Sequence, residues 1–323
     1  MVAFAAIVGL GERARAQAGC IVGWGQGVGG NGNLTPPTGS DWVEVAAGYQ
    51  FCIGRLSDGS VKGWGRNDVG QATPPTGTFV SVSAGYNHAM ALKANGDVVV
   101  WGAGTGNHGS SLEAPPGLKA TAIAAGENWC MAIQTDGTIF GWGVPALVGA
   151  NIPEGEFVEI AAGAHFGIAR RADGTIAVWA APHFECSRTV PVVRTSPDVV
   201  PSPLPPIVAI AAGHCTAYAL TDYGYVIGWG GSFLCSQQSN PFDDSMYSEI
   251  AGGYGSAMAR RVNGSIVAWG AQDEVPPCDP PDFCCEWVRG QTPIPPALLQ
   301  ITALRIAKGH SNLAHFVIVP DCP

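Results

Sequence analysis

Apolar residues along this chain occur in short runs that are separated by turns rich in glycine, proline, aspartate and asparagine. The runs "AMAL" (89–92) and "VVVW" (98–101) are apolar at consecutive positions, which is typical of strands buried on both faces. Between them, Asn95-Gly96 predicts a tight two-residue hairpin turn whose central residues both take positive φ. The pattern therefore predicts many short β-strands, paired as hairpins and stacked sheet against sheet.

These hairpins belong to a repeat. The segment "VEVAAGYQFCIGRLSDGSVKGWG" (43–65) returns at 80–102, 121–143, 158–180, 208–230 and 248–270. In every copy an anchor glycine precedes the turn glycine by 11 residues, and a tryptophan follows the turn glycine after 5 more. The anchor glycines are Gly48, Gly85, Gly126, Gly163, Gly213 and Gly253, and the tryptophans are Trp64, Trp101, Trp142, Trp179, Trp229 and Trp269. Such constant spacing indicates repeated structural units.

The two ends of the repeat region complement each other. "GCIVGWG" (19–25) matches the second half of a copy, with Trp24 in register, and "LRIAKGHSNLAHFVIVPD" (304–321) matches the first half, with Gly309 as its anchor. Small residues at the anchors and tryptophans after the turns suit a radial array that is narrow inside and wide outside. The sequence thus predicts an all-β, seven-bladed β-propeller over residues 19–323, closed by pairing of the N- and C-terminal half repeats.

The repeat resembles that of the regulator of chromosome condensation family. The best local matches are "GYNHAMALKANGDVVVWG" (85–102) and "GWGRNDVGQ" (63–71). The resemblance implies a seven-bladed propeller. The segment "W-G-x-N-x-x-G-Q-x-x-x-P" followed by "I-A-A-G" is also similar to secreted bacterial propellers that inhibit β-lactamases, which implies an exported, protein-binding molecule.

Composition narrows the function. Only 13% of the residues are charged, and the formal net charge is -9, so a basic surface for nucleic acid is not expected. The chain has no Gly-x-Ser-x-Gly elbow, paired-carboxylate signature or phosphate loop followed by a helix. The cysteine spacing "CDPPDFCC" does not fit a zinc site. We therefore expect neither catalysis nor a cofactor nor a bound metal.

The first residues suggest export. "MVAFAAIVGL" (1–10) is apolar but too short to span a bilayer, and Ala16-Gln17-Ala18 has the form of a signal-peptidase site. Residues 1–18 are interpreted as a truncated signal peptide, or otherwise as a disordered tail or the product of a wrongly assigned start codon. We expect an extracellular or cell-surface protein without a membrane span.

Insertions and cysteines add to this picture. Long connectors at 181–206, 231–247 and 271–303 occupy the same place in the repeat, so we expect them to form one irregular rim. Cys20 and Cys322 meet where the terminal halves pair, which predicts a disulfide. The strand cysteines are expected to be small buried side chains without a chemical role; these are Cys52, Cys130 and Cys215.

The residues after the anchor glycines are the candidate partner surface, because they vary within a constant frame and include types favoured at interfaces. They are Tyr49, Tyr86, Asn87, Glu127, Asn128, Trp129, His165, His214, Tyr254 and His310. Alternatively, they cap the inner strands, as expected for His88. The predicted function is a monomeric, non-catalytic module that binds another protein, as a scaffold or inhibitor. The alternative is a carbohydrate-binding or enzymatic propeller with a site assembled from several blades.

Overall fold

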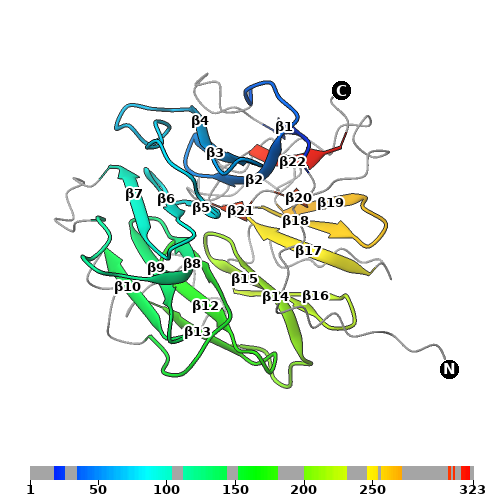
Figure 1. The fold of residues 1–323 in the computed structure, drawn as a ribbon. Helices are drawn as coiled ribbons and strands as arrows, with labels where there is room; N and C mark the ends of the chain where they lie inside the picture. Colours follow the sequence, from blue (N-terminus) through cyan, green and yellow to red (C-terminus); the bar gives the residue numbers. More distant parts are fainter. Residues whose placement is uncertain are drawn as a thin grey trace, which may run out of the picture.

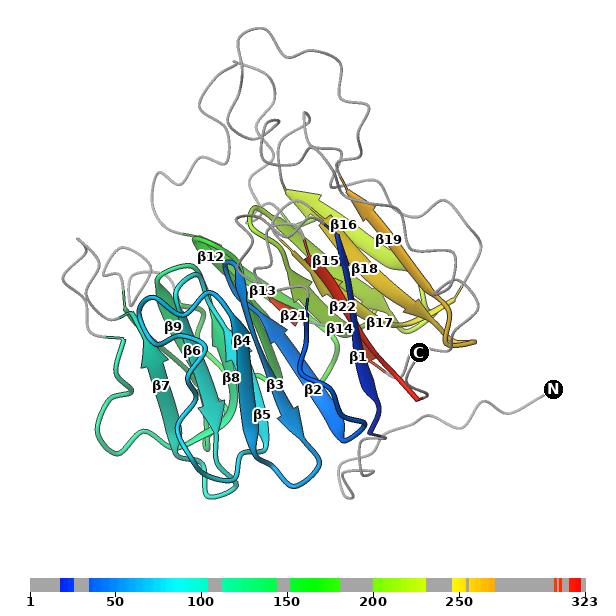
Figure 2. The same cartoon turned by 90° about the horizontal axis from the view of Figure 1, so that it is seen from above.

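The protein is a seven-bladed β-propeller, as the sequence predicted. The computed structural model describes residues 18–25, 35–103, 112–143, 152–180, 200–230, 246–253, 256–270, 305–306, 308–309 and 314–320. These residues form seven sheets and no helix. The sheets are arranged radially around a central axis (Figure 1), and their strands run roughly along that axis (Figure 2).

Each blade is an antiparallel meander of an inner, a middle and an outer strand. Blade 1 is β2 (Trp42–Ala47), β3 (Phe51–Leu56) and β4 (Val61–Gly65), and blade 2 is β5 (Ser81–Ala84), β6 (His88–Leu92) and β7 (Val98–Gly102). Blade 3 is β8 (Ala120–Ala125), β9 (Trp129–Gln134) and β10 (Ile139–Gly143), and blade 4 is β11 (Glu159–Ala162), β12 (Phe166–Arg170) and β13 (Ile176–Ala180). Blade 5 is β14 (Ile207–Ala212), β15 (Thr216–Thr221) and β16 (Val226–Gly230), and blade 6 is β17 (Tyr247–Gly252), β18 (Ser256–Arg261) and β19 (Ile266–Gly270).

Blade 7 joins the two ends of the chain. It consists of β20 (Arg305–Ile306), β22 (Ala314–Val319) and β1 (Cys20–Gly25), with Cys20 opposite Val319. The short strand β21 (Lys308–Gly309) pairs in parallel with β2 of blade 1. The predicted closure by terminal half repeats is therefore confirmed. Cys20 is disulfide-bonded, but Cys322 lies outside the described residues, so the pairing of these two cysteines stays a prediction.

The turn between the middle and outer strands differs from the predicted one. In blade 1 only Gly59 of the turn has a positive φ, 85°, and its amide donates to the carbonyl of Leu56 while the Leu56 amide donates to Ser60. This is a three-residue loop, a type I turn followed by a left-handed glycine. The two-residue prediction was wrong because this loop needs only one residue with a positive φ, the glycine. Asp58 supports the turn by accepting hydrogen bonds from the amide and the hydroxyl of Ser60.

Close approach of neighbouring blades explains the anchor glycines. A Cβ on Gly48 would lie 2.5 Å from the carbonyl oxygen of Gly85, and a Cβ on Gly85 would lie 2.4 Å from that of Gly126. Both distances are far below van der Waals contact, so only glycine lets the inner strands approach this closely.

The repeated tryptophans do more than fill space. The indole of Trp101 donates to the carbonyl of Gln71, and that of Trp142 donates to Leu112, each 3.0 Å away and each in the connector before its blade. In blades 2 and 3 the outer-strand tryptophan thus fixes the preceding connector as well as packing between sheets.

Candidate binding face

The propeller has two chemically different ends. Middle strands begin where outer strands finish, because Phe51 pairs with Gly65 and Phe166 pairs with Ala180. We call this the anchor end, since it carries the turns that follow the anchor glycines. The opposite side, where the loops between middle and outer strands lie, is the hairpin end. The strands β13, β16 and β19, which precede the three insertions, also finish at the anchor end.

Backbone hydrogen bonds join successive anchor turns. The amide of Tyr49 donates to the carbonyl of Tyr86, and the amide of Tyr86 donates to Glu127, both at 3.1 Å. On the other side of the ring, Ala164 donates to His214 and His214 donates to Gly253. The turns therefore hold adjacent blades together through their backbones, while the side chains of Tyr49, Tyr86, Glu127 and His214 stay partly exposed.

An aromatic and polar cluster lies on the anchor turns of blades 1 and 2. The rings of Tyr49 and Tyr86 stack at a centroid distance of 4.2 Å and an interplanar angle of 8°. The guanidinium of Arg66 lies 5.7 Å from the Tyr49 ring centroid and donates to Asn87 Oδ1. It also donates to Asp68, at 2.6 Å. Tyr49, Tyr86, Arg66 and Asn87 together form a rigid, half-exposed surface that combines the faces of two aromatic rings with a cation.

The connector supports this cluster. Gln71, which is fully buried, donates from Nε2 to Asp68 Oδ1. This hydrogen bond, together with that from Arg66, holds the pKa of the Asp68 carboxyl below its usual value. The ionised Asp68 in turn orients the guanidinium. Sequence reasoning treated this segment only as a connector and missed Arg66, because its hydrogen bond to Asn87 of blade 2 depends on how two blades pack.

The anchor turns of blades 3 to 5 add further polar side chains to the anchor end. His165 Nε2 lies 3.0 Å from Glu127 Oε2, which links the anchor turns of blades 3 and 4. His214 Nδ1 lies 3.1 Å from the sulfur of Cys215. Asn128 is also partly exposed. The predicted surface residues Tyr254 and His310 lie outside the described residues.

Trp129 does not belong to this surface. Its side chain is 0% exposed, and its indole N–H is shared between the carbonyl oxygens of Gly163 and Ala164, at 3.2 and 3.0 Å. It occupies the repeat position of His88, which is also buried and lies 3.3 Å from Cys130 Sγ of blade 3. The prediction of Trp129 as a surface contact was wrong, because this position faces the neighbouring blade and not the solvent.

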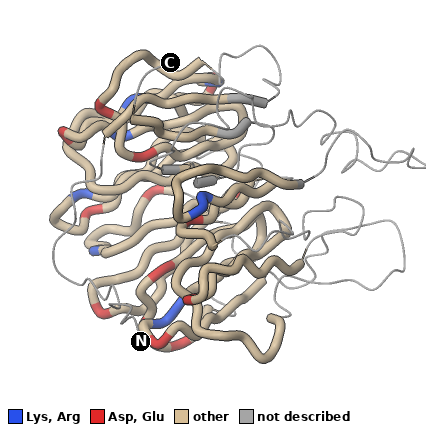
Figure 3. Tube along the Cα trace, turned by 90° about the vertical axis from the view of Figure 1, so that its right-hand side faces the viewer, with Lys and Arg blue, Asp and Glu red and all other residues tan. Residues whose placement is uncertain are grey.

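Charge separates the two ends. Among the described residues, the anchor turns and the first three connector positions carry Arg66, Asp68 and Glu127. The loops of the hairpin end carry an acidic residue in most blades, for example Asp58, Asp136 and Asp173. In Figure 3 most charged positions gather toward the left-hand side, where these loops turn. On the described part of the anchor end, few charges and a stacked tyrosine pair occur together, a combination typical of the centre of a protein interface.

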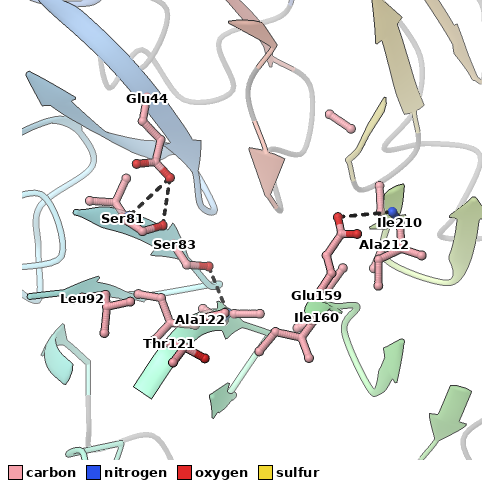
Figure 4. Close-up of a pocket in the computed structure, with 18 of the residues that line it drawn as sticks. Glu44, Ser81, Ser83, Leu92, Thr121, Ala122, Glu159, Ile160, Ile210 and Ala212 are labelled. Carbon is pink, nitrogen blue, oxygen red and sulfur yellow. Dashed lines mark hydrogen bonds between the residues drawn. The ribbon is translucent and has the colours of Figure 1, made fainter. Parts of the chain in front are cut away.

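A second candidate is a cavity of about 410 Å³ lined by the inner strands (Figure 4). The carboxylates of Glu44 and Glu159 are its most polar groups, yet each is used to join blades. Glu44 accepts from Arg55 Nε and, through its other oxygen, from the hydroxyl of Ser81 in blade 2. Glu159 likewise accepts from its own blade and from the amide of Ile210 in blade 5. The cavity therefore has the polar groups of a scaffold rather than those of a ligand site.

The glutamates that join the blades belong to Glu–Arg pairs that recur in the sequence, which sequence reasoning did not notice. We call these Glu–Arg pairs the latches. Blades 1, 4 and 6 pair a glutamate four residues before the anchor with an arginine seven residues after it: Glu44–Arg55, Glu159–Arg170 and Glu249–Arg260. In blades 2, 3 and 5 the second position is Leu92, Ile133 and Leu220, and the first is never acidic. The two positions change together between copies because they face each other on adjacent strands.

The described residues give no sign of metal or thiol chemistry. They contain no group of three or more histidine, cysteine or acidic side chains that could hold a metal ion. Cys52, Cys130 and Cys215 are buried and free of disulfides, as predicted. Burial raises the pKa of the Cys52 and Cys130 thiols, so these groups stay protonated. The described segments also contain no helix that is long and apolar enough to cross a membrane.

Comparison with known proteins agrees with the architecture. The family model described as "Regulator of chromosome condensation (RCC1) repeat" matches residues 42–71 and 79–109, which include all strands of blades 1 and 2. The chain carries RCC1 repeats. No curated protein matches it in sequence.

Solved propellers share the whole fold of this RCC1-repeat chain. Prp20p from Saccharomyces cerevisiae superposes with a TM-score of 0.69 at 16% identity, covering 94% of this chain and 92% of its own. Human WBSCR16 gives a TM-score of 0.65 at 16% identity, with 94% and 99% covered. The ectodomain of the Arabidopsis thaliana receptor kinase ACR4 gives 0.58 at 19% identity, with 84% and 88% covered. At these identities the likeness concerns the fold.

Proposed function

We propose that this RCC1-repeat propeller is an exported, non-catalytic module that binds another protein through its anchor end, as a scaffold or an inhibitor. The observation that carries the proposal is the stacked Tyr49–Tyr86 pair with Arg66 beside it on the anchor turns. Tyrosine and arginine contribute most to binding energy in protein interfaces, and here both are held in place before any partner arrives.

The rigid backbone under these side chains supports the same conclusion. The hydrogen bonds between successive anchor turns fix the spacing of Tyr49, Tyr86 and Glu127 across three blades. A surface that is already ordered loses little conformational entropy on binding. The strands that precede the three insertions finish at this end, so the insertions leave the blades next to the proposed surface.

Proteins of similar fold support the class of function. Prp20p binds Gsp1p and histones, and Kap60 forms a complex with yeast RCC1. Export of the present chain is supported by the apolar residues 1–10, by the Ala16-Gln17-Ala18 sequence and by the disulfide bond of Cys20, since disulfides persist in oxidising compartments.

Affinity capture from the extracellular fraction of the producing organism tests the proposal. Three baits are compared: the native protein, Tyr49→Ala with Tyr86→Ala, and the hairpin-end control Asp58→Asn. We expect the native protein and the control to retain the same partner, and the tyrosine variant to lose it at least tenfold, as for an interface hot spot. Equal capture by all three baits, or no partner with any of them, would contradict the proposal. Circular dichroism verifies that the variant is folded.

Export has its own test. The mass of the protein recovered from the culture medium should correspond to a chain that starts after Ala18, with Cys20 linked to Cys322 in non-reducing peptide maps. A chain retained inside cells with residues 1–18 attached would refute export without affecting the binding proposal.

A further inference from the structure

An exposed apolar patch lies at the hairpin end of blades 5 and 6, on the side opposite the anchor turns. It includes the loop between β15 and β16 and the start of β17 (Figure 1). Its large side chains are exposed to more than half of their surface: Tyr223 (63%), Tyr225 (52%), Met246 (51%) and Val262 (65%). We call these four residues the tyrosine patch. Exposed apolar side chains that occur singly need no explanation, but contiguous ones indicate an interaction site.

Backbone contacts show that the patch is continuous across the blade boundary. The carbonyl of Gly224, between the two tyrosines, accepts a hydrogen bond of 2.8 Å from Tyr247, the residue after Met246. A Cβ on Gly224 would lie 3.1 Å from the Cβ of Met246. The amide of Val262 in turn donates to the carbonyl of Met246, at 3.0 Å. Met246 thus lies between the tyrosine loop of blade 5 and the loop of blade 6.

The other blades show what these loops contain when they serve only as turns. In blades 1 to 4 and 6, the residue before the turn glycine and the residue after it form a polar side-chain pair. The pairs are Asp58 with Ser60, Asn95 with Asp97, Asp136 with Thr138, Asp173 with Thr175, and Asn263 with Ser265. Blade 5 has Tyr223 and Tyr225 at these two positions. In place of the polar pair it has two exposed rings, and the Tyr225 amide donates to Thr221 Oγ1 instead.

The chemistry of the patch and its edge defines the partner. Tyrosine and methionine are enriched at the centres of protein interfaces, and Met246 adapts its shape to an apolar contact. Exposed carboxylates lie on the blade 4 and blade 5 side of the patch: Asp222 precedes Tyr223, and Asp173 lies in the adjacent loop, whose Gly174 carbonyl accepts from Ile207 of blade 5. On the blade 6 side, Arg261 lies over the Tyr247 ring and donates to Ser265. The chain has a net charge of -9, so a second copy would bring like charges together. Four side chains also offer less than the roughly 800 Å² per partner of a stable interface.

We propose that the tyrosine patch is a second interaction surface, which binds a different protein through an apolar segment flanked by lysine or arginine. The two tyrosines supply rigid ring surface, Met246 and Val262 complete the apolar floor, and Asp173 and Asp222 attract the basic residues. This surface lies at the hairpin end and does not depend on the anchor end.

The blade 4 loop supplies the test variant. Tyr223→Asp with Tyr225→Thr recreates the Asp-Gly-Thr sequence of residues 173–175, so it removes both rings while restoring the polar turn. Its midpoint of urea unfolding should equal or exceed that of the native protein. The matched control is Asp136→Asn with Thr138→Ser in blade 3, and Asp222→Asn tests the acidic edge.

A displayed library of random 12-residue peptides, selected on the immobilised native protein, is the probe. We expect enriched peptides in which apolar residues adjoin lysine or arginine. Their affinity should fall at least tenfold on the Tyr223→Asp, Tyr225→Thr variant and should be unchanged on the blade 3 control. Asp222→Asn should weaken binding and reduce its dependence on salt, since screening acts on the charged edge.

Three results would overturn the proposal. Peptides that bind the double variant as well as the native protein would place their site elsewhere. Enriched peptides without basic residues would show that Asp173 and Asp222 do not select the partner. A dimer in sedimentation velocity that dissociates in the double variant would identify a second copy as the occupant. Loss of partner capture on changing Tyr49 and Tyr86 concerns the anchor end alone, so the two proposals can fail separately.

Discussion

Replacement of Trp129 by phenylalanine tests whether the third residue after an anchor glycine stabilises the fold or binds a partner. A structural role predicts a loss in the free energy of unfolding. The indole N–H contacts two buried carbonyl oxygens, those of Gly163 and Ala164, and both lose this donor. A buried polar group left without its partner costs about 1–3 kcal/mol. The smaller ring also gives up apolar contact worth about 1 kcal/mol. We therefore expect Trp129→Phe to lower the free energy of unfolding by about 2–4 kcal/mol, and Trp129→Ala by about 3–5 kcal/mol.

Equilibrium unfolding in urea, followed by far-UV circular dichroism, measures this loss without relying on the tryptophan fluorescence that the substitution changes. Tyr86→Ala is the matched control: it lies on the anchor turn of the neighbouring blade 2, is partly exposed and stacks on Tyr49. Its stacking is worth about 0.5–1.5 kcal/mol. A loss below about 0.5 kcal/mol in Trp129→Phe, combined with lost partner capture, would refute the structural role and return Trp129 to the binding surface.

Three further predictions concern the latches, the turns and the thiols. A double-mutant cycle of Glu159→Gln and Arg170→Gln should give a coupling of about 0.5–1.5 kcal/mol in urea unfolding, and additive losses would show that the pair does not join the strands. The hydroxyl and amide of Thr138 lower the pKa of Asp136, so its stabilisation is present above pH 4 and is lost as the pH falls through the lowered pKa. The melting temperature between pH 6 and pH 2 should therefore depend less on pH in Asp136→Asn, and identical curves would contradict this. Burial raises the pKa of Cys130, so iodoacetamide at pH 8 should label it only after unfolding, as peptide mass mapping would show.

Local patterns in the sequence were sufficient to predict the architecture. The spacing from Gly48 to Gly59 to Trp64, repeated along the chain, specified the meander of each blade, because turn glycines and apolar runs act over a few residues. The half repeats at 19–25 and 304–321 predicted the closure seen between β1 and β22. Within the blades the detail of the turn was wrong, since a type I turn followed by one left-handed glycine also joins two strands tightly and needs only one positive φ.

Contacts between blades decided the rest. Tyr86 and Trp129 are both aromatic residues near an anchor glycine, yet one is partly exposed and the other is fully buried. Tyr86 lies in the anchor turn at the end of the propeller, whereas Trp129 is the first residue of the middle strand β9 and packs between sheets; residue type alone does not reveal this difference.

The sequence by itself determined the number of blades, the ring closure and the low charge of the chain, because these follow from periodicity and composition. Only the tertiary structure decided which residues share a surface. It joined Arg66 to Asn87 of the next blade and Glu44 to Ser81 of the next blade, and it exposed Tyr223 and Tyr225 beside Met246. Each of these arrangements joins segments from separate repeats, and their distances are set by the packing of whole blades rather than by any local pattern.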